Sequence, residues 1–274
     1  MQSLPFIKMH GLGNDYIYID CFQESTAALI TKTDIPSLSR RISDRHFGVG
    51  SDGLVLMSPS KEADAEMRIF NADGSEAEMC GNAIRCVGKY LYESGLCPST
   101  SIAIKTLAGI RILTLLVQNG VVSQVKVNMG IPIVKTDTLP LKGMDILGFT
   151  SVNMGNPHAV FFRNWVISDA EMAEMGEHIS IHPHFPDGTN VEFVYVRNVH
   201  ELDVRVWERG TGETLACGTG ACAAAVAANR LGETENEVVV HLKGGDLFIQ
   251  YDPIYKIAYM TGPATEVYRG QYIL

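Results

Sequence analysis

Three features are scarce or missing in this chain of 274 residues, and each absence excludes a class of protein. No run of lysine and arginine occurs, and 22 basic residues stand against 31 acidic ones, for a formal net charge of −9. Because nucleic-acid binding needs a concentrated positive surface, we predict no nucleic-acid partner. No stretch reaches the roughly 18 consecutive apolar residues of a membrane-spanning helix, and residues 1–19 lack the apolar core of a signal peptide. These absences predict a cytoplasmic protein that does not associate with membranes.

Cysteine is too sparse for a secreted protein held together by disulfides, because only six cysteines are spread over the whole chain. Reduced thiols are the default in the cytosol, so each cysteine has to be interpreted from its own surroundings. The apolar fraction of 46% and the charged fraction of 19% are those of an ordinary globular protein. The length of the chain predicts about two domains.

Short apolar runs bounded by glycine, asparagine, aspartate and proline dominate the sequence and predict many short strands. Helical patterns are fewer, and the predicted class is therefore α+β with the sheet dominating. We place the helices at residues 35–46, 81–93, 169–177 and 218–231. The strands are expected at residues 16–20, 53–57, 103–105, 112–117, 122–127, 158–162, 191–196, 203–207, 238–242 and 247–251.

An internal repeat divides the chain into two halves. A glutamate lies four residues before a Cys-Gly pair in two places, at Cys80 and at Cys217. A Gly-Asn pair precedes these cysteines at similar distances, with Asn14 lying 66 residues before the first and Asn156 lying 61 residues before the second. Packing alone would not select cysteine, glycine and asparagine. The repeat therefore indicates two equivalent functional halves.

Cys80 and Cys217 each stand at the predicted start of a helix and are each followed by glycine. The unpaired N–H groups and the macrodipole at a helix start favour an anion, so a thiol there ionises more easily, and the thiolate is the reactive form. The plain alternative is that a cysteine is a small apolar packing residue. The repeat, the glycine and the helix start together favour a catalytic role for Cys80 and Cys217. We assign packing to the other four, Cys21, Cys86, Cys97 and Cys222.

Two equivalent thiols, one in each half, suit the inversion of a stereocentre. One proton has to leave one face of the carbon while another arrives at the opposite face, so two acid/base groups must flank it. Negative charge accumulates on the carboxylate of an amino-acid substrate as its α-proton leaves, and helix N-termini would stabilise that charge. We expect the backbone N–H groups of Gly81, Asn82, Gly218 and Thr219 to do so.

Motifs for metal or cofactor binding are weak in this chain. The glycine pattern of residues 48–53 matches a dinucleotide-binding motif, but it follows a predicted helix and precedes a predicted strand, which is the reverse of that motif's order. His178, His182 and His184 resemble a metal site, but Pro183 and the polar setting favour an exposed loop. The cysteine spacings do not fit a structural zinc site, and no lysine suggests a pyridoxal Schiff base. We therefore predict no metal and no cofactor.

Six segments, taken in order along the chain, resemble the diaminopimelate epimerase family. They are KMHGLGNDY, RIFNADGSEAEMCGNAIRC, MGNPHAVFF, GTNVEF, WERGTGETLACGTGACA and YMTGPA. The resemblance covers essentially the whole chain and is most specific around the two repeated cysteines. It implies an isomerase that interconverts LL- and meso-2,6-diaminopimelate without a cofactor, in the pathway to lysine and peptidoglycan precursors. Cys80 and Cys217 would be its acid/base pair.

The resemblance also implies an architecture and a set of binding residues. Two similar, pseudo-symmetric domains would each wrap a mostly antiparallel, barrel-like sheet around a central helix, over residues 1–128 with 263–274 and residues 129–262. The active site would lie in the cleft between them, and we expect a homodimer, the commonest assembly. Arg209 would pair with the distal carboxylate, and His158 and Glu208 would assist the proton balance of the thiols. The implied substrate-binding residues are Asn14, Asn71, Gly81, Asn82, Asn156, Asn190, Glu208, Arg209, Gly218 and Thr219.

Two other functions stay open at this point. A proline or hydroxyproline racemase of the same fold typically has histidine after its first Cys-Gly pair, where this chain has Asn82. This chain also has Arg209 for a second substrate carboxylate. A non-enzymatic redox sensor would switch by forming a disulfide between Cys80 and Cys217, so it would work through oxidation, whereas oxidation should inactivate an epimerase.

Overall fold

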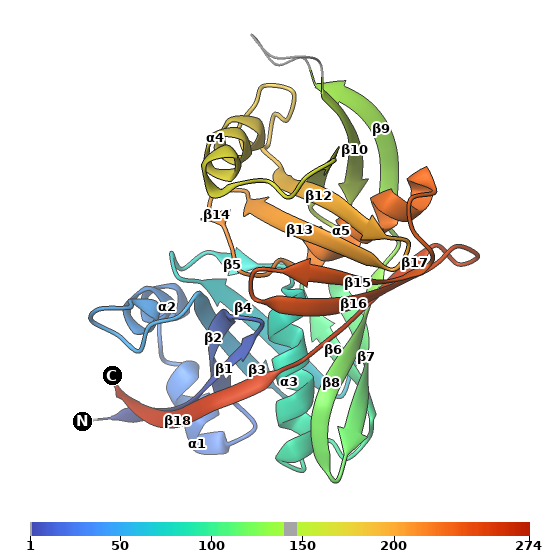
Figure 1. The fold of residues 1–274 in the computed structure, drawn as a ribbon. Helices are drawn as coiled ribbons and strands as arrows, with labels where there is room; N and C mark the ends of the chain where they lie inside the picture. Colours follow the sequence, from blue (N-terminus) through green and yellow to red (C-terminus); the bar gives the residue numbers. More distant parts are fainter. Residues whose placement is uncertain (1, 140–146) are drawn as a thin grey trace. The chain divides into compact units, whose positions relative to one another are not determined.

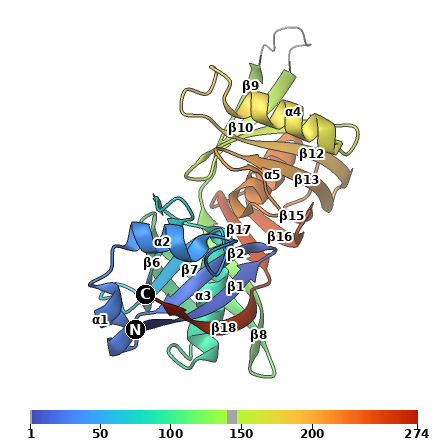
Figure 2. The same ribbon diagram turned by 90° about the vertical axis from the view of Figure 1, so that its left-hand side faces the viewer.

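The computed structural model describes residues 2–139 and 147–274, which form five helices and eighteen strands (Figure 1, Figure 2). The chain divides into two compact units, one made of Met1–Val127 with Gly262–Leu274 and the other of Asn128–Thr261. The predicted α+β class with a dominant sheet is confirmed. Within the described ranges, no helix is long and apolar enough to cross a membrane.

The sheet of the first unit runs in the order β18-β1-β2-β3-β4-β6-β7-β8, and the short strand β5 pairs with β4. The pairs β2–β3 and β4–β6 are parallel, and the others are antiparallel. The bounds are β1 (Ser3–Gly11), β2 (Asn14–Asp20), β3 (Gly53–Ser58), β4 (Ala65–Asn71), β5 (Glu76–Ala77), β6 (Ser101–Thr106), β7 (Gly109–Gln118), β8 (Val121–Gly130) and β18 (Thr265–Ile273).

Helix α3 (Gly81–Glu93) is the centre of the first unit. It contacts β1 and β2 near one end of the strand order and β7 near the other, so the sheet curves around it. Residues 81–91 are buried without a break, which is the pattern of a helix enclosed by protein on all sides. The first unit also contains α1 (Glu24–Ile30) and α2 (Ile35–Ser43).

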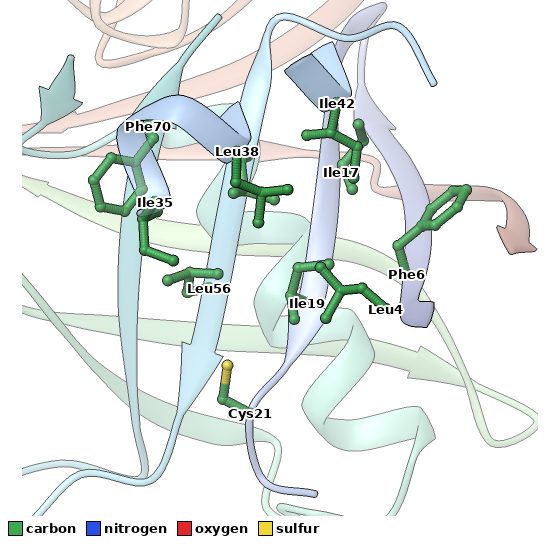
Figure 3. Close-up of a cluster of buried hydrophobic side chains, with 11 residues drawn as sticks. Leu4, Phe6, Ile17, Ile19, Cys21, Ile35, Leu38, Ile42, Leu56 and Phe70 are labelled. Carbon is green, nitrogen blue, oxygen red and sulfur yellow. The ribbon is translucent and has the colours of Figure 1, made fainter. Parts of the chain in front are cut away.

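Helix α2 covers the other face of this sheet, as Figure 3 shows. Its apolar residues Ile35, Leu38 and Ile42 recur at helical spacing, and all three are buried against strand residues such as Leu54 and Leu56. The predicted helix over residues 35–46 is therefore confirmed, although it ends at Ser43. Both faces of the sheet are covered, which explains why β3 reads as one continuous apolar run.

The second unit repeats this topology strand for strand. Its sheet runs β9-β10-β11-β12-β13-β15-β16-β17 with β14 beside β13, and again only the third and fifth ladders, β11–β12 and β13–β15, are parallel in the described residues. The bounds are β9 (Ile133–Leu139), β10 (Leu147–Asn153), β11 (Pro157–Arg163), β12 (Asn190–Asn198), β13 (Glu201–Glu208), β14 (Gly212–Glu213), β15 (Glu237–Leu242), β16 (Gly245–Asp252) and β17 (Ile257–Gly262).

Helix α5 (Gly218–Leu231) is the central helix of the second unit. Residues 220–228 are all buried, and the helix contacts strands around the whole curve, from β10 to β16. The alanine-rich sequence allows this enclosure because small side chains let the strands approach from every side. Helix α4 (Asp169–Ser180) covers the outer face and begins with a capping box formed by Ser168 and Glu171.

Strand register makes individual residues of the two units equivalent. Two positions after the Gly-Asn pair of the repeat, the first unit has Tyr16 and the second has His158. Across the parallel ladder that follows, Tyr16 pairs with Gly53, and His158 pairs with Asn190. The repeat seen in the sequence is therefore a repeat of strand order and register.

Several elements differ from the expectation. Helix α1 was not predicted, because it has only seven residues and no side-chain cap at its start. Strands β1, β4, β5, β9, β10, β14, β17 and β18 also lie outside the ranges expected for strands.

His178, placed in an exposed loop with His182 and His184, lies instead in the last turn of α4, because that helix continues to Ser180. A basic side chain is favourable at a helix C-terminus when it is charged.

Replacing Leu38 with alanine should destabilise the first unit. The side chain is fully buried between α2 and the sheet, so its loss should lower the free energy of unfolding by about 2–5 kcal/mol. Denaturant unfolding followed by circular dichroism would measure the change. Arg41→Ala, on the exposed side of the same helix turn, is the control and should change the stability by about 0.5 kcal/mol or less. Equal losses for the two variants would contradict this assignment of the core.

Candidate active site

Cys80 is the residue that caps the start of α3. Its backbone is extended, with φ of −133°, and its sulfur accepts a hydrogen bond from the Ala83 N–H at 3.5 Å. Its thiol donates to the Asn14 side-chain oxygen at 3.3 Å. The structure thus joins two residues that the sequence repeat had singled out 66 positions apart.

The side chain of Asn14 is itself held in place by a carboxylate. The Asn14 amide nitrogen donates to Asp52 Oδ2 at 2.8 Å, and the backbone N–H of Asp15 donates to the same oxygen at 3.0 Å. Arg45 bonds to both Asp15 and Asp52, each at 2.8 Å. Burial raises the pKa of Asp52 above its ordinary value. The amide orientation that presents an oxygen to Cys80 is therefore fixed by a charged cluster.

Cys217 caps α5 in the same way. Its sulfur accepts from the Gly220 N–H at 3.4 Å and lies 3.4 Å from the Thr219 hydroxyl. The Asn156 amide nitrogen donates to that hydroxyl at 3.4 Å. The Asn156 oxygen lies 3.0 Å from Nε2 of His158. A chain of polar contacts therefore leads from the thiol into the interior of the second unit.

Burial dominates the ionisation of Cys217. The residue is only 6% exposed, and burial raises the pKa of its thiol well above the ordinary value, with the charges of Glu208 and Glu192 raising it further. The bonds from Thr219 and Gly220 act in the opposite direction but are the smaller contributions. The expectation that the helix start makes this thiol easier to ionise is therefore wrong for Cys217 as a net effect.

The glutamate four residues before each cysteine has a structural role that the sequence left unassigned. Glu76 forms a two-pronged ion pair with Arg68 of β4, with distances of 2.7 and 3.0 Å. Glu213 forms the same pair with Arg205 of β13, with distances of 2.7 and 2.9 Å. Paired arginine and carboxylate groups of this geometry fix orientation as well as position. Each pair anchors the short strand that leads to a cysteine.

The remaining predicted residues occupy loop and strand ends of their own units. Asn190 donates to the Pro157 carbonyl at 3.0 Å and accepts from the Arg209 N–H at 2.9 Å, while the Arg209 guanidinium donates to the Asp187 carbonyl at 2.7 Å. Glu208 accepts from the Thr214 hydroxyl at 2.5 Å. The first-unit Asn71 donates to the Ser75 hydroxyl at 3.0 Å. Gly81, Asn82, Gly218 and Thr219 form the first helical turns, as predicted.

Two functional candidates were missed by sequence reasoning, Asp52 and Glu192. Asp52 orients Asn14, and Glu192 lies 2.6 Å from Nδ1 of His158. Nothing in the local pattern distinguishes Asp52 from an ordinary turn aspartate. The signal for Glu192 is a single acidic residue inside an otherwise apolar run, residues 191–196.

The histidines of the α4 region form ordinary contacts. The rings of His178 and His182 lie edge to face with centroids 6.0 Å apart, and His184 contacts Asp137 at 3.2 Å. Among the residues that the structure describes, no group of three or more His, Cys, Asp or Glu side chains is placed to hold a metal ion. The four other cysteines, Cys21, Cys86, Cys97 and Cys222, are all buried, as their assignment to packing predicted.

Comparison with known proteins places this geometry in a family. The sequence model described as Diaminopimelate epimerase matches residues 6–135 and 150–267. The chain belongs to the diaminopimelate epimerase family. The diaminopimelate epimerase of Pelotomaculum thermopropionicum is 51% identical over 98% of this chain and 99% of its own length. That of Acetivibrio thermocellus is 49% identical over 98% of each chain. The resemblance seen in the sequence is confirmed.

Solved structures outside the diaminopimelate epimerases share the fold at low identity. A phenazine biosynthesis protein of the PhzF family from Bacillus anthracis has a TM-score of 0.76 with 17% identity, covering 100% of both chains. A hydroxyproline epimerase from Agrobacterium vitis has a TM-score of 0.74 with 17% identity, covering 99% of this chain and 93% of its own. At this level of identity the likeness supports the two-unit fold of the diaminopimelate epimerase family and not a shared substrate.

Replacing Glu208 with glutamine should make Cys217 easier to ionise. The charge of Glu208 raises the pKa of this thiol, so removing it should lower the pH at which Cys217 becomes a thiolate. The measurement is the pH dependence of iodoacetamide labelling at Cys217, read by mass spectrometry of its peptide, because only the thiolate reacts. Glu201→Gln, at the opposite end of β13, is the control for charge and should leave the midpoint unchanged. An unshifted midpoint in Glu208→Gln would refute the electrostatic coupling.

Proposed function

We propose that this protein interconverts LL- and meso-2,6-diaminopimelate without a cofactor, with Cys80 and Cys217 as its two acid/base groups. The observation that supports this most directly is the duplicated cap. In each of two units with the same strand order, a cysteine sulfur accepts a backbone N–H at the start of the buried central helix. Each sulfur is also connected to the asparagine of the Gly-Asn repeat, directly in one unit and through Thr219 in the other.

Inversion requires one thiol to give a proton while the other receives one. In the direction where Cys217 is the acid, its neutral thiol delivers a proton to one face of the α-carbon. Cys80 first loses to solvent the proton that it donates to Asn14, and as a thiolate it then removes the proton from the other face. The reaction leaves Cys217 as the thiolate and Cys80 as the thiol, which is the starting state for the reverse direction. The raised pKa of Cys217 supports this assignment because it keeps a proton on that sulfur at neutral pH.

The carboxylate at the reacting centre binds the N–H groups at the two helix starts. Gly81, Asn82, Gly218 and Thr219 present these groups, which stabilise the negative charge that develops as the α-proton leaves. The distal end of the substrate is bound by the guanidinium of Arg209 and by polar side chains. The side chains proposed to contact substrate are Asn14, Asn71, Asn156, Asn190 and Glu208.

We further propose that residues 1–128 with 263–274 and residues 129–262 are functional halves, each supplying one thiol. His158 and Glu208 assist the proton balance of the second half, since both belong to the surroundings of Cys217. The protein works in the cytoplasm, where thiols stay reduced, and acts as a homodimer. Its reaction supplies precursors of lysine and peptidoglycan.

Deuterium exchange tests the reaction itself. Reduced protein incubated with LL-diaminopimelate in D₂O, without pyridoxal phosphate, should place deuterium at the α-carbon as the meso isomer forms. Proton transfer by a positioned group contributes about 100-fold or more to a rate, so Cys80→Ala and Cys217→Ala should each lower the turnover at least that much. Nuclear magnetic resonance of the α-protons measures both results.

The packing cysteines provide the matched control. Cys222→Ala removes a fully buried thiol from the same helix that Cys217 caps, and it should keep turnover within about threefold of the starting protein. Full turnover in either Cys80→Ala or Cys217→Ala would disprove the two-thiol mechanism. Failure of the folded, reduced protein to exchange any deuterium would disprove the epimerase proposal. Activity that appears only after oxidation would favour the redox sensor, and exchange with proline instead would favour the racemase.

A further inference from the structure

Glu192 of β12 is a carboxyl group in an unusual place. Its side chain is completely buried, and one of its oxygens lies 2.6 Å from Nδ1 of His158, whose side chain is also completely buried. The other oxygen, Oε2, has no hydrogen-bond partner among residues 2–139 and 147–274. Burying a carboxyl group without full hydrogen bonding costs stability, so a purely structural role would be served better by an apolar side chain.

The contacts of His158 fix how many protons this buried pair holds. Asn156 donates through its amide nitrogen to Thr219, so its oxygen can only accept from the Nε2–H of His158 at 3.0 Å. A second proton lies between Nδ1 and the Glu192 oxygen. With two protons, the pair has no net charge, whether it is written as an ion pair or as two neutral groups.

The first unit lacks this arrangement at equivalent positions. Counting two residues along β3 and β12 from the paired positions Gly53 and Asn190, Glu192 corresponds to Val55. Three residues after the capping cysteine, Gly220 corresponds to Ala83. A β-carbon at Gly220 would lie 2.7 Å from the Glu192 oxygen, closer than such contacts occur. The second unit therefore has glycine at the point on its helix where the carboxyl group needs room.

We propose that Glu192 is a positioning residue for proton transfer at Cys217, which it controls by orienting His158 and, through Asn156 and Thr219, the thiol. This inference rests on the proposed role of Cys217 in epimerisation. Glu192 does not touch the thiol in this chain of contacts and acts through His158. The role of Glu208, in contrast, was already implied by the family resemblance.

Electrostatics gives Glu192 a second effect on the same thiol. Among the described groups, Glu208 from β13 and Glu192 from β12 are the ones whose charges raise the pKa of Cys217. Burial raises the pKa of Glu192 itself, the bond and charge of His158 lower it, and Glu208 raises it. Glu192 therefore affects Cys217 both by geometry and by charge, and two substitutions can separate these effects.

The experiment compares Glu192→Val, which copies the first unit, with Glu192→Gln, which matches the protonated carboxyl group in shape. Val194→Ala is the control, because Val194 is also fully buried and lies two residues along the same face of β12. Two readouts are needed: kcat and KM for LL-diaminopimelate, and the pH midpoint of iodoacetamide labelling at Cys217. Thermal unfolding confirms that each variant is folded.

We expect Glu192→Val to lower kcat about tenfold or more, with KM changed less than about threefold, because orientation of the acid/base group is lost while substrate contacts remain. Glu192→Gln should keep kcat within about threefold, because its amide can donate to His158 Nδ1. Neither variant should move the labelling midpoint to higher pH, since both remove a carboxyl group whose charge raises the pKa of Cys217. Val194→Ala should lower the unfolding temperature and move neither the midpoint nor kcat beyond about threefold.

Gly220→Ala tests the same contact without changing any charge. The added β-carbon should displace the Glu192 carboxyl group from His158, so kcat should fall as it does in Glu192→Val. Because both substitutions break one contact, the double variant should be no worse than the worse single variant. Additive losses would contradict a shared contact.

A Glu192→Val variant with wild-type kcat would overturn the proposal, and a labelling midpoint that moves to higher pH would contradict the electrostatic effect. A folded Glu192→Gln variant with a kcat as low as that of Glu192→Val would also overturn the proposal. A side chain of the same shape would then not restore kcat. These results differ from a failure of the proposed function, in which the unmodified protein itself would exchange no deuterium. Labelling at Cys217 does not require catalysis, so its link to Glu192 is measured in either case.

Discussion

The bond between a cysteine sulfur and the first free N–H groups of a buried helix is the constraint on which the site depends. A helix start leaves backbone donors without partners, and inside a protein each such donor must be satisfied. Cys80 and Cys217 satisfy one donor each, and in doing so they hold a reactive atom at the end of a rigid element. The glycine after each cysteine keeps the neighbouring backbone open to a ligand. The same bond therefore serves both the fold and the position of the thiol.

Duplication has preserved the framework and changed the polar residues around it. Strand order, the sequence of parallel and antiparallel ladders and the arginine–glutamate anchors agree between the two units. Around Cys217, however, the second unit places His158 and Glu192 where the first has Tyr16 and Val55. The two thiols are thus alike in backbone geometry and different in surroundings. Such a difference is expected where two groups must be in opposite protonation states at the same moment.

The sequence was sufficient for features that depend on local chemistry or on the repeat. The starts of α3 and α5 could be predicted because each combines a cysteine, a glycine and a long helical pattern. Glu192 could not, because a single charge in an apolar strand is ordinarily assigned to the solvent side. Its burial depends on β11 lying beside β12 and on Gly220 coming from a helix that follows it in sequence. The high pKa of Cys217 was missed for a related reason, since a helix start is visible in sequence and the depth of burial is not.

Strand β18 affects the order in which the molecule can be completed. It forms an antiparallel ladder with β1, and the carbonyl of Pro263, just before it, accepts from the fully buried Arg85 of α3 at 3.0 Å. Residues 262–274 leave the ribosome after all of residues 128–261, so the later unit has its whole chain available first. Until residues 262–274 are made, one edge of β1 is unpaired, and Arg85 of α3 lacks its hydrogen bond to Pro263. The first unit, whose N-terminal strands are synthesised first, is therefore the second of the two units to have its complete chain.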